Sequence, residues 1–334
     1  MFNDRQGIGG AWVTIATPSY ETIKDWKEKM IASHFSDPFR LNEIHDEAMG
    51  KVFEIAINRL KLGEPPCEYS WFITGSGGRF EQGPISDQDH GIVYVNSNLE
   101  DEHYFAELGK EISHGLNIVG YPYCQGNVMS SNPLWCKSME KWKQQLFTWM
   151  DEATWETVRN LQIFYDARAL QGNEFLVREL KDVFYDYEKT HPTLLKRLME
   201  NVMHIKNGIG PLGQIIVEEH GTNVGSINLK YTAFLPYVNA IRLLAIKEGI
   251  YETSTIDRMN SLVRMNGYSA VLRESRKHFL TLLKYRNSLY KAETYDDTHY
   301  LSVKSLSKEE KKEIKRILKD GKRLHQYVSN LIMH

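Results

Sequence analysis

The feature that most constrains this chain is residues 71–95, WFITGSGGRFEQGPISDQDHGIVYV. An apolar run leads into the glycine-rich turn Gly75–Gly78, and a second apolar run, 91–95, follows the acidic residues Asp87 and Asp89. Short apolar runs bounded by turn residues are typical of buried β-strands. The segment therefore predicts two strands of one sheet, with a tight turn and two carboxylates at their ends.

The carboxylates Asp87 and Asp89 are two residues apart in the sequence. In an extended segment, residues i and i+2 point to the same side of the chain, so both side chains would project together. Two carboxylates at close range repel each other unless a cation lies between them. Mg²⁺ prefers carboxylate, water and phosphate oxygens, and Mn²⁺ accepts the same ligands. The pair therefore predicts a site for Mg²⁺ or Mn²⁺.

The turn Gly75–Gly78 opens a predicted helix next to that pair. Glycine lets backbone N–H groups approach an anion closely at a helix N-terminus. Arg79 adds a planar guanidinium that suits phosphate. A phosphate-binding turn beside a metal site indicates the transfer of a phosphoryl or nucleotidyl group. Four residues of this segment are therefore expected to bind a nucleotide: Gly75, Ser76, Arg79 and Ser86.

The periodicity of apolar residues changes along the chain. It predicts helices over 41–60, 101–117, 138–149 and 231–247, and strand-like runs over 68–74, 91–95 and 161–165. Ser138 is the expected cap of the helix over 138–149. Capping residues predict two further helix starts, at Ser254 or Thr255 and at the capping box Ser307–Glu310. Strand signals end in the middle of the chain, so the sequence predicts an α+β part followed by an all-α part.

The length of 334 residues suggests about two domains. We expect an N-terminal extension over 1–40, a first domain over 41–187 and a helical domain over 188–334. A content of 42% hydrophobic and 25% charged residues excludes a disordered chain. The net charge of -2 argues against a nucleic-acid partner. Three scattered cysteines, no signal peptide and no long apolar run predict a cytoplasmic protein without a membrane partner.

The glycine turn and the acidic pair have a spacing found in one enzyme superfamily. Gly75-Ser76, ten further residues and then Asp87-x-Asp89 resemble the motif of the DNA polymerase β-type nucleotidyltransferases. The whole stretch 75–89 is still more similar to a family of nucleotidyltransferases often found downstream of CBS domains. That family is similar in turn to the catalytic part of PII-protein uridylyltransferase.

Three later stretches resemble the same family: 124–142, 164–172 and 228–258. The resemblance implies a small polymerase β-like sheet with helices, followed by a helical bundle that binds substrate. It also implies a uridylyl- or adenylyltransferase-like enzyme that acts in signal transduction. Such an enzyme moves a nucleoside monophosphate from an NTP to a hydroxyl group on a protein or a small molecule.

The resemblance further implies which residues act. The superfamily uses three carboxylates, and Asp87 and Asp89 correspond to the first two. Asp166 follows the third strand-like run and is the candidate for the third, as a metal ligand and a catalytic residue. Lys230 and Arg242 belong to the helical part and would close over phosphate or acceptor.

The chain departs from the family in two places. The CBS pair is absent, and Asn228 stands where the family commonly has Asp. Simpler interpretations also exist for several residues. Asp166 could form an ion pair with Arg168, and Lys230 and Arg242 could lie on solvated helix faces.

Two other functions stay open at this point. The chain could bind a nucleotide and signal through a partner without turnover, or it could be a nucleotidyltransferase-type toxin or antitoxin. The sequence identifies neither the nucleotide base nor the acceptor.

Overall fold

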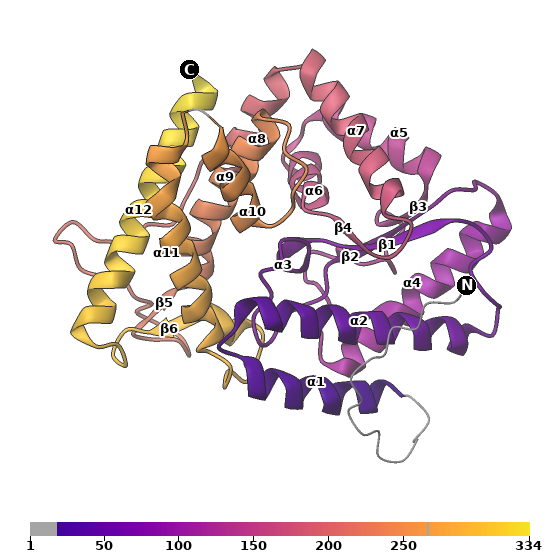
Figure 1. Ribbon diagram of the computed structural model, residues 1–334, viewed down its shortest axis with the longest axis horizontal. Helices are drawn as coiled ribbons and strands as arrows, with labels where there is room; N and C mark the ends of the chain where they lie inside the picture. Colours follow the sequence, from indigo (N-terminus) through magenta and orange to yellow (C-terminus); the bar gives the residue numbers. More distant parts are fainter. Residues whose placement is uncertain (1–18, 266) are drawn as a thin grey trace, which may run out of the picture.

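A computed structural model describes residues 19–265 and 267–334 (Figure 1). The chain forms two halves that lie side by side in this view. The sheet half, residues 19–190, contains a four-stranded sheet, and the helical half, residues 192–334, consists mainly of helices. The predicted α+β fold class is therefore confirmed. None of the described helices is long and apolar enough to cross a membrane.

The four-stranded sheet has the strand order β3-β2-β1-β4. Its strands are β1 (Tyr69–Ile73), β2 (His90–Tyr94), β3 (Cys136–Ser138) and β4 (Arg168–Gly172). β1 is antiparallel to both β2 and β4, whereas β2 and β3 are parallel. In the central pair, Trp71 lies opposite Ile92. The strands predicted around the glycine turn are thus confirmed.

Successive side chains of β1 pack on opposite faces of the sheet, as strand geometry requires. Trp71 and Ile73 belong to an apolar core beneath the sheet, together with residues of α1, α2 and α4. Phe72 belongs to a second core on the other face. Burial on both faces explains why both strands appear as short apolar runs in the sequence.

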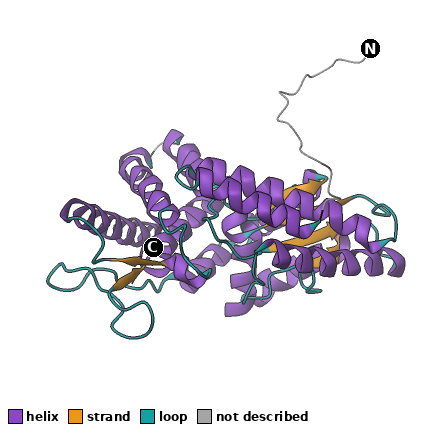
Figure 2. Cartoon of the chain, turned by 90° about the horizontal axis from the view of Figure 1, so that it is seen from below, coloured by secondary structure: helices purple, strands orange, loops and turns teal. Residues whose placement is uncertain are grey.

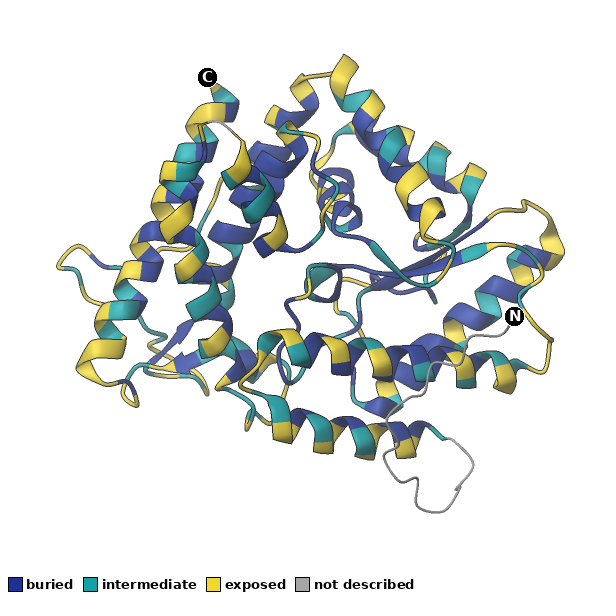
Figure 3. Ribbon diagram, viewed as in Figure 1, coloured by how far each residue is buried: buried dark blue, intermediate teal, exposed yellow. Residues whose placement is uncertain are grey.

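Helices cover both faces of the sheet (Figure 2). Those of the sheet half are α1 (Tyr20–His34), α2 (Pro38–Leu60), α3 (Gly75–Gly78), α4 (Leu99–Val119), α5 (Met139–Glu152), α6 (Trp155–Tyr165) and α7 (Glu174–Thr190). In Figure 3, α1 and α2 are buried on the side facing the molecule and exposed on the other. This is the pattern of amphipathic surface helices.

The helical half contains five α-helices, one π-helix and one 3₁₀-helix among the described residues. They are α8 (Thr193–Val202), the π-helix η1 (Lys230–Phe234), α9 (Leu235–Lys247), α10 (Thr255–Arg264), α11 (Ser269–Asn287), the 3₁₀-helix η2 (Asp296–His299) and α12 (Lys308–Met333). A two-stranded ribbon of β5 (Ser226–Asn228) and β6 (Tyr300–Ser302) was not predicted. The predicted caps are confirmed at Ser138, at Ser254 and at the capping box Ser307–Glu310.

The two halves share one continuous apolar core. It runs from Phe72 and Val93 in the sheet, through Trp142 and Phe164, to Val328 in α12. All five side chains are at most 1% exposed. The boundary between the halves is therefore filled with buried side chains rather than bridged by a loose linker.

The prediction of a strand over 161–165 is wrong, because these residues form the end of α6. Thr154 caps this helix, and Val158, Leu161 and Phe164 recur every three residues on its buried side. A short apolar run at a helix end cannot be distinguished from a buried strand by its hydrophobicity alone. The strand of this region, β4, begins two residues after Asp166.

Residues 1–18 of the expected N-terminal extension lie outside the described part of the chain. The rest of that extension, from residue 19 to residue 40, forms α1 and the first turn of α2. Both helices pack against each other and against α4. This part of the chain thus belongs to the layer that covers one face of the sheet.

Candidate active site

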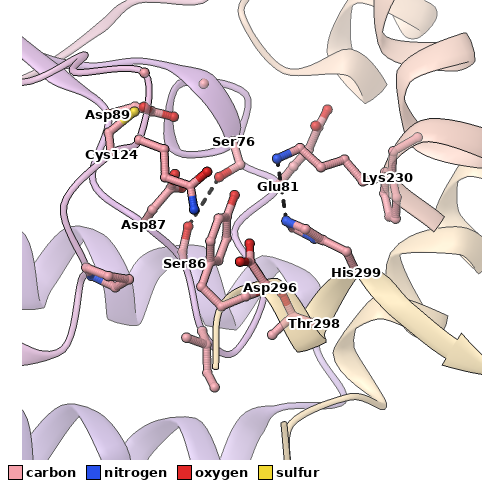
Figure 4. A pocket seen from close by; sticks show the side chains of 18 of the residues that line it. Ser76, Glu81, Ser86, Asp87, Asp89, Cys124, Lys230, Asp296, Thr298 and His299 are labelled. Carbon is pink, nitrogen blue, oxygen red and sulfur yellow. Dashed lines mark hydrogen bonds between the residues drawn. The ribbon is translucent and has the colours of Figure 1, made fainter. Parts of the chain in front are cut away.

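A cavity of about 520 Å³ lies where the sheet half meets the helical half. One wall comes from the turn after β1 and the loop before β2, and the other from η1, α9, α11 and η2. Figure 4 shows these two walls facing each other, with Asp87 and Asp89 on one side and Lys230 and His299 on the other. The cavity is therefore built from segments far apart in the sequence.

The acidic pair lies on the sheet wall of this cavity. Asp87, Asp89 and Cys124 each offer one ligand atom, and these atoms all lie within 4.8 Å of one another. Among the described residues this group does not include Asp166. The two carboxylates thus lie close together, as predicted, and the third side chain of the group is the thiol of Cys124.

Burial raises the pKa of both carboxylates of the pair. The pKa of Asp87 rises to about 7 because of burial and of the neighbouring charge on Asp89. A hydrogen bond from Tyr295 partly opposes this rise at Asp87, and one from Cys124 does so at Asp89. The pair thus carries negative charge that nearby cations only partly compensate, which favours a bound cation.

The glycine turn packs directly against the acidic pair. Gly75 has a φ of 57°, and a Cβ atom built on it would lie 2.2 Å from Asp89 Oδ2. A Cβ on Gly78 would lie 2.1 Å from the backbone oxygen of Asp166. The turn forms the short helix α3, and Ser76 Oγ lies 3.3 Å from Ser86 Oγ across the segment that follows (Figure 4). Only glycine fits this close approach.

Lys230 brings a positive charge to the cavity from the helical half. It is the first residue of the π-helix η1, a form that is frequent at functional sites. Its Nζ lies 3.5 Å from His299 Nε2. Burial, together with the charges of Lys230 and Arg286, lowers the pKa of His299 to about 3. The imidazole is therefore neutral at pH 7 and accepts this hydrogen bond.

Asp166 has a different environment from the acidic pair. Its carboxylate is fully buried and binds three guanidinium groups: Arg79 Nη1 at 2.7 Å, Arg242 Nη2 at 2.6 Å and Arg258 Nη1 at 2.8 Å. Burial alone would raise the pKa of Asp166, but the arginines hold it well below its ordinary value. These contacts occupy both oxygens, so the structure does not bring Asp166 to the metal pair.

Both arginines that were predicted to bind a nucleotide, Arg79 and Arg242, take part in this cluster. Arg79 lines the cavity, and it also binds Glu81 through a contact of 2.8 Å. Arg242 is 7% exposed and is not among the residues that line the cavity. Its partners are Asp166 and Asn239, so the structure places Arg242 behind the site rather than over it. The alternative partner of Asp166, Arg168, binds Asp46 instead.

The cavity also contains cations that sequence reasoning missed. Arg159 lines it from α6, and Arg286 lines it from α11. The Nε and Nη2 atoms of Arg286 are buried without a hydrogen-bond partner among the described residues. Its guanidinium lies over the ring of Phe234, 4.3 Å from the centroid. Nothing in the local sequence marks these residues, because only the fold brings them to the cavity.

The donor set fits a divalent cation. Asp87 and Asp89 offer two hard oxygen ligands, and both residues line the cavity. Mg²⁺ is commonly held by one or two carboxylates, with waters and phosphate oxygens completing its shell. Cys124 lies beside them, but burial raises its pKa to about 12, so at pH 7 it is a neutral thiol that donates a hydrogen bond to Asp89 rather than a metal ligand.

The mixed sheet with its covering helices, the glycine turn and the paired carboxylates together define a nucleotidyltransferase fold. Two family models match this chain. "Putative nucleotidyltransferase DUF294" matches residues 39–156, and "Putative nucleotidyltransferase substrate binding domain" matches residues 192–332. The chain therefore belongs to this family, and the resemblance found in the sequence is confirmed. No curated protein matches the chain.

Proposed function

We propose that this protein moves a nucleoside monophosphate from an NTP to an acceptor hydroxyl group, with release of pyrophosphate. The observation that supports this most is the half-buried pair Asp87 and Asp89, which faces a cavity beside the glycine turn. Both requirements of the reaction, a phosphate-binding turn and a cation site, meet there within one segment. The acceptor is a protein or a small molecule.

In this proposal Asp87 and Asp89 hold Mg²⁺ or Mn²⁺, which stabilises the charge that develops on the transferred phosphate. The N–H groups of the turn at Gly75 and Ser76 face the phosphate tail. Lys230 and Arg286 compensate phosphate charge from the helical half, since both line the same cavity. These positive groups stay fixed during the reaction, so they stabilise the transition state without reorganising.

We also propose a division into a catalytic domain over 41–187 and a substrate-binding domain over 188–334. The two family models, which match 39–156 and 192–332, support this division. A cytoplasmic location and a role in signal transduction complete the proposal. In this scheme the acceptor approaches from the helical side of the cavity, near η2.

Labelled nucleotides test the proposal. The purified protein is incubated with each NTP, labelled at the α-phosphate, together with Mg²⁺ and a cell lysate. We expect one NTP to label a macromolecule or a small molecule, and Asp87→Asn to abolish the label. Asp25→Asn, which changes an exposed residue of α1, is the matched control. No labelling with any NTP would contradict transfer.

A second candidate is a protein that binds a nucleotide without turning it over. The observation that favours it is the environment of Asp166, whose carboxylate is bound by arginines, so that Asp166 does not supply the pair with a third carboxylate. Calorimetry separates the two candidates. Metal-dependent NTP binding without any labelled product, in the lysate that supplies the acceptor, would support the second.

A further inference from the structure

A second cavity, of about 230 Å³, lies outside the site described above and shares no lining residue with it. Its walls come from the start of β4, from the first half of α7 and from the loop before α10. The polar residues of these walls are Arg168, Glu174, Arg178, Lys181 and Thr253, with the Tyr251 ring beside them. Positive side chains thus outnumber the single carboxylate.

Lys181 is the least expected of these residues. It is 5% exposed, and no hydrogen bond or ion pair joins it to any residue within 19–265 or 267–334. Its ammonium lies 5.6 Å from the ring centroid of Tyr165. The nearby carboxylate of Asp166 is already bound by three arginines. Burial and the charge of Arg258 lower the pKa of Lys181 to about 7, and the charge of Asp166 only partly opposes this shift.

A second cation that lines this cavity, Arg178, is exposed. The guanidinium of Arg178 lies 4.8 Å from the ring centroid of Tyr251, and it forms no ion pair in the described chain. Arg168, in contrast, is neutralised by Asp46 at 2.6 Å. The one lining carboxylate, Glu174, pairs with neither Lys181 nor Arg178 within 4.0 Å. Two cations that line this space therefore have no counter-ion among the described residues.

We propose that this cavity is a second binding site, for a small phosphate-bearing anion. A buried ammonium is costly unless it is paired, so an anion that binds Lys181 offsets this cost. Arg178 supplies a planar guanidinium that matches phosphate oxygens in a bidentate manner. The volume lies below the range of about 300–1,000 Å³ that is usual for drug-sized ligands, so a phosphate or pyrophosphate group fits and a whole nucleotide does not.

The wall of this cavity is joined to the glycine turn. Arg168 donates from Nε to the backbone oxygen of Gly77 at 3.0 Å. Asp166, next to the lining residue Ala167, binds Arg79 of the larger cavity. The two cavities are thus neighbours across one buried ionic cluster, with separate sets of cations. Because the two cavities have separate cations, a substitution can disrupt one binding site and leave the other intact.

Calorimetry with inorganic phosphate, pyrophosphate and glycerol phosphate tests the proposal. Binding of at least one of these anions should weaken by about tenfold or more in Lys181→Met and in Arg178→Gln. It should persist in Lys189→Met, which changes an exposed lysine of the same helix. Lys230→Met, which alters the larger cavity, should not remove the binding that depends on Lys181. The three probes separate a free anion from a phosphate ester. Loss of binding in Lys230→Met alone would overturn the proposal.

Chemical labelling of the unmodified protein gives a readout that does not depend on how the variants fold. An amine-reactive reagent is applied with and without the anion, and the labelled lysines are identified by mass spectrometry. The anion should protect Lys181 and leave the exposed Lys189 unchanged. Equal labelling of Lys181 with and without each of the three anions would overturn the proposal.

Discussion

The acidic pair and Asp166 are carboxylates in two different environments, one half-buried and the other fully buried. Asp87 and Asp89 face a cavity, repel each other and have raised pKa values. Asp166 has no exposure, is surrounded by three guanidinium groups and has a lowered pKa. A carboxylate whose charge the protein leaves uncompensated can bind a ligand. A carboxylate that is paired with arginines stabilises the fold instead. Proximity to the site therefore does not by itself identify a catalytic carboxylate.

The largest expected effect comes from removing one carboxylate of the pair. Asp87→Asn or Asp89→Asn should reduce transfer by about 10⁴-fold or more, which is roughly 5 kcal/mol in the barrier, because the proposed cation would lose one of its two carboxylate ligands. The fold should persist, since the change removes repulsion. Initial rates of labelled transfer and thermal melting measure both effects. A variant that keeps its rate would show that the pair is not the metal site.

At Asp166 we expect a substitution to lower the free energy of unfolding rather than the rate of transfer. Asp166→Asn leaves three arginines around a neutral group, and removing one partner of a buried ionic cluster costs about 3–5 kcal/mol. Denaturant unfolding measures this loss, with Asp25→Asn as the control. The transfer rate per folded molecule should fall by less than about tenfold. A stable variant with a far lower transfer rate would indicate that Asp166 is a catalytic residue.

The glycine turn should respond to an added methyl group. A Cβ at Gly75 would lie 2.2 Å from Asp89 Oδ2, so Gly75→Ala must displace this carboxylate. We expect transfer to fall by about 10²-fold, the usual cost of misplacing a reacting group by about 1 Å. Gly63→Ala is the matched control, because Gly63 also has a positive φ, of 83°, and a Cβ there meets nothing within 4 Å. Equal losses in both variants would mean that backbone strain, not the contact, is responsible.

The smallest expected effect is a dependence of stability on pH. The folded pKa of Asp87, about 7, lies above its unfolded value, so the folded protein binds the extra proton between the two. Without metal, the melting temperature should therefore be a few degrees lower at about pH 8 than at about pH 5.5. Mg²⁺ should reduce this difference, and so should Asp87→Asn. An identical pH dependence in the wild type and in Asp87→Asn would contradict the raised pKa.

The sequence contained enough information to predict the local part of the site. The turn at Gly75, the two strands and the pair Asp87 and Asp89 all lie within one segment, where short-range patterns determine structure. Helix caps such as Ser138 and Ser307 were predictable for the same reason, since capping uses neighbours in the chain. The prediction failed for 161–165 because a helix and a strand can present the same short apolar run.

The remaining parts of the site depend on long-range contacts. Arg258 binds Asp166 although 92 positions separate them, and no local pattern predicts this pair. Arg286 and His299 enter the cavity from the last third of the chain. Lys230 was predicted only through the family resemblance, and its place depends on the π-helix that begins there. Such residues are determined by packing between elements, which a single sequence does not display.

The continuous core between the two halves has a consequence for motion. Domains joined by a polar or sparse interface commonly hinge, whereas a large apolar interface resists opening because water would have to enter. Here buried side chains extend from Phe72 of the sheet to Val328 of α12 without interruption. Substrate exchange should therefore proceed through small movements at the rim of the cavity. The two halves should also melt as one cooperative unit, although each is matched by a separate family model.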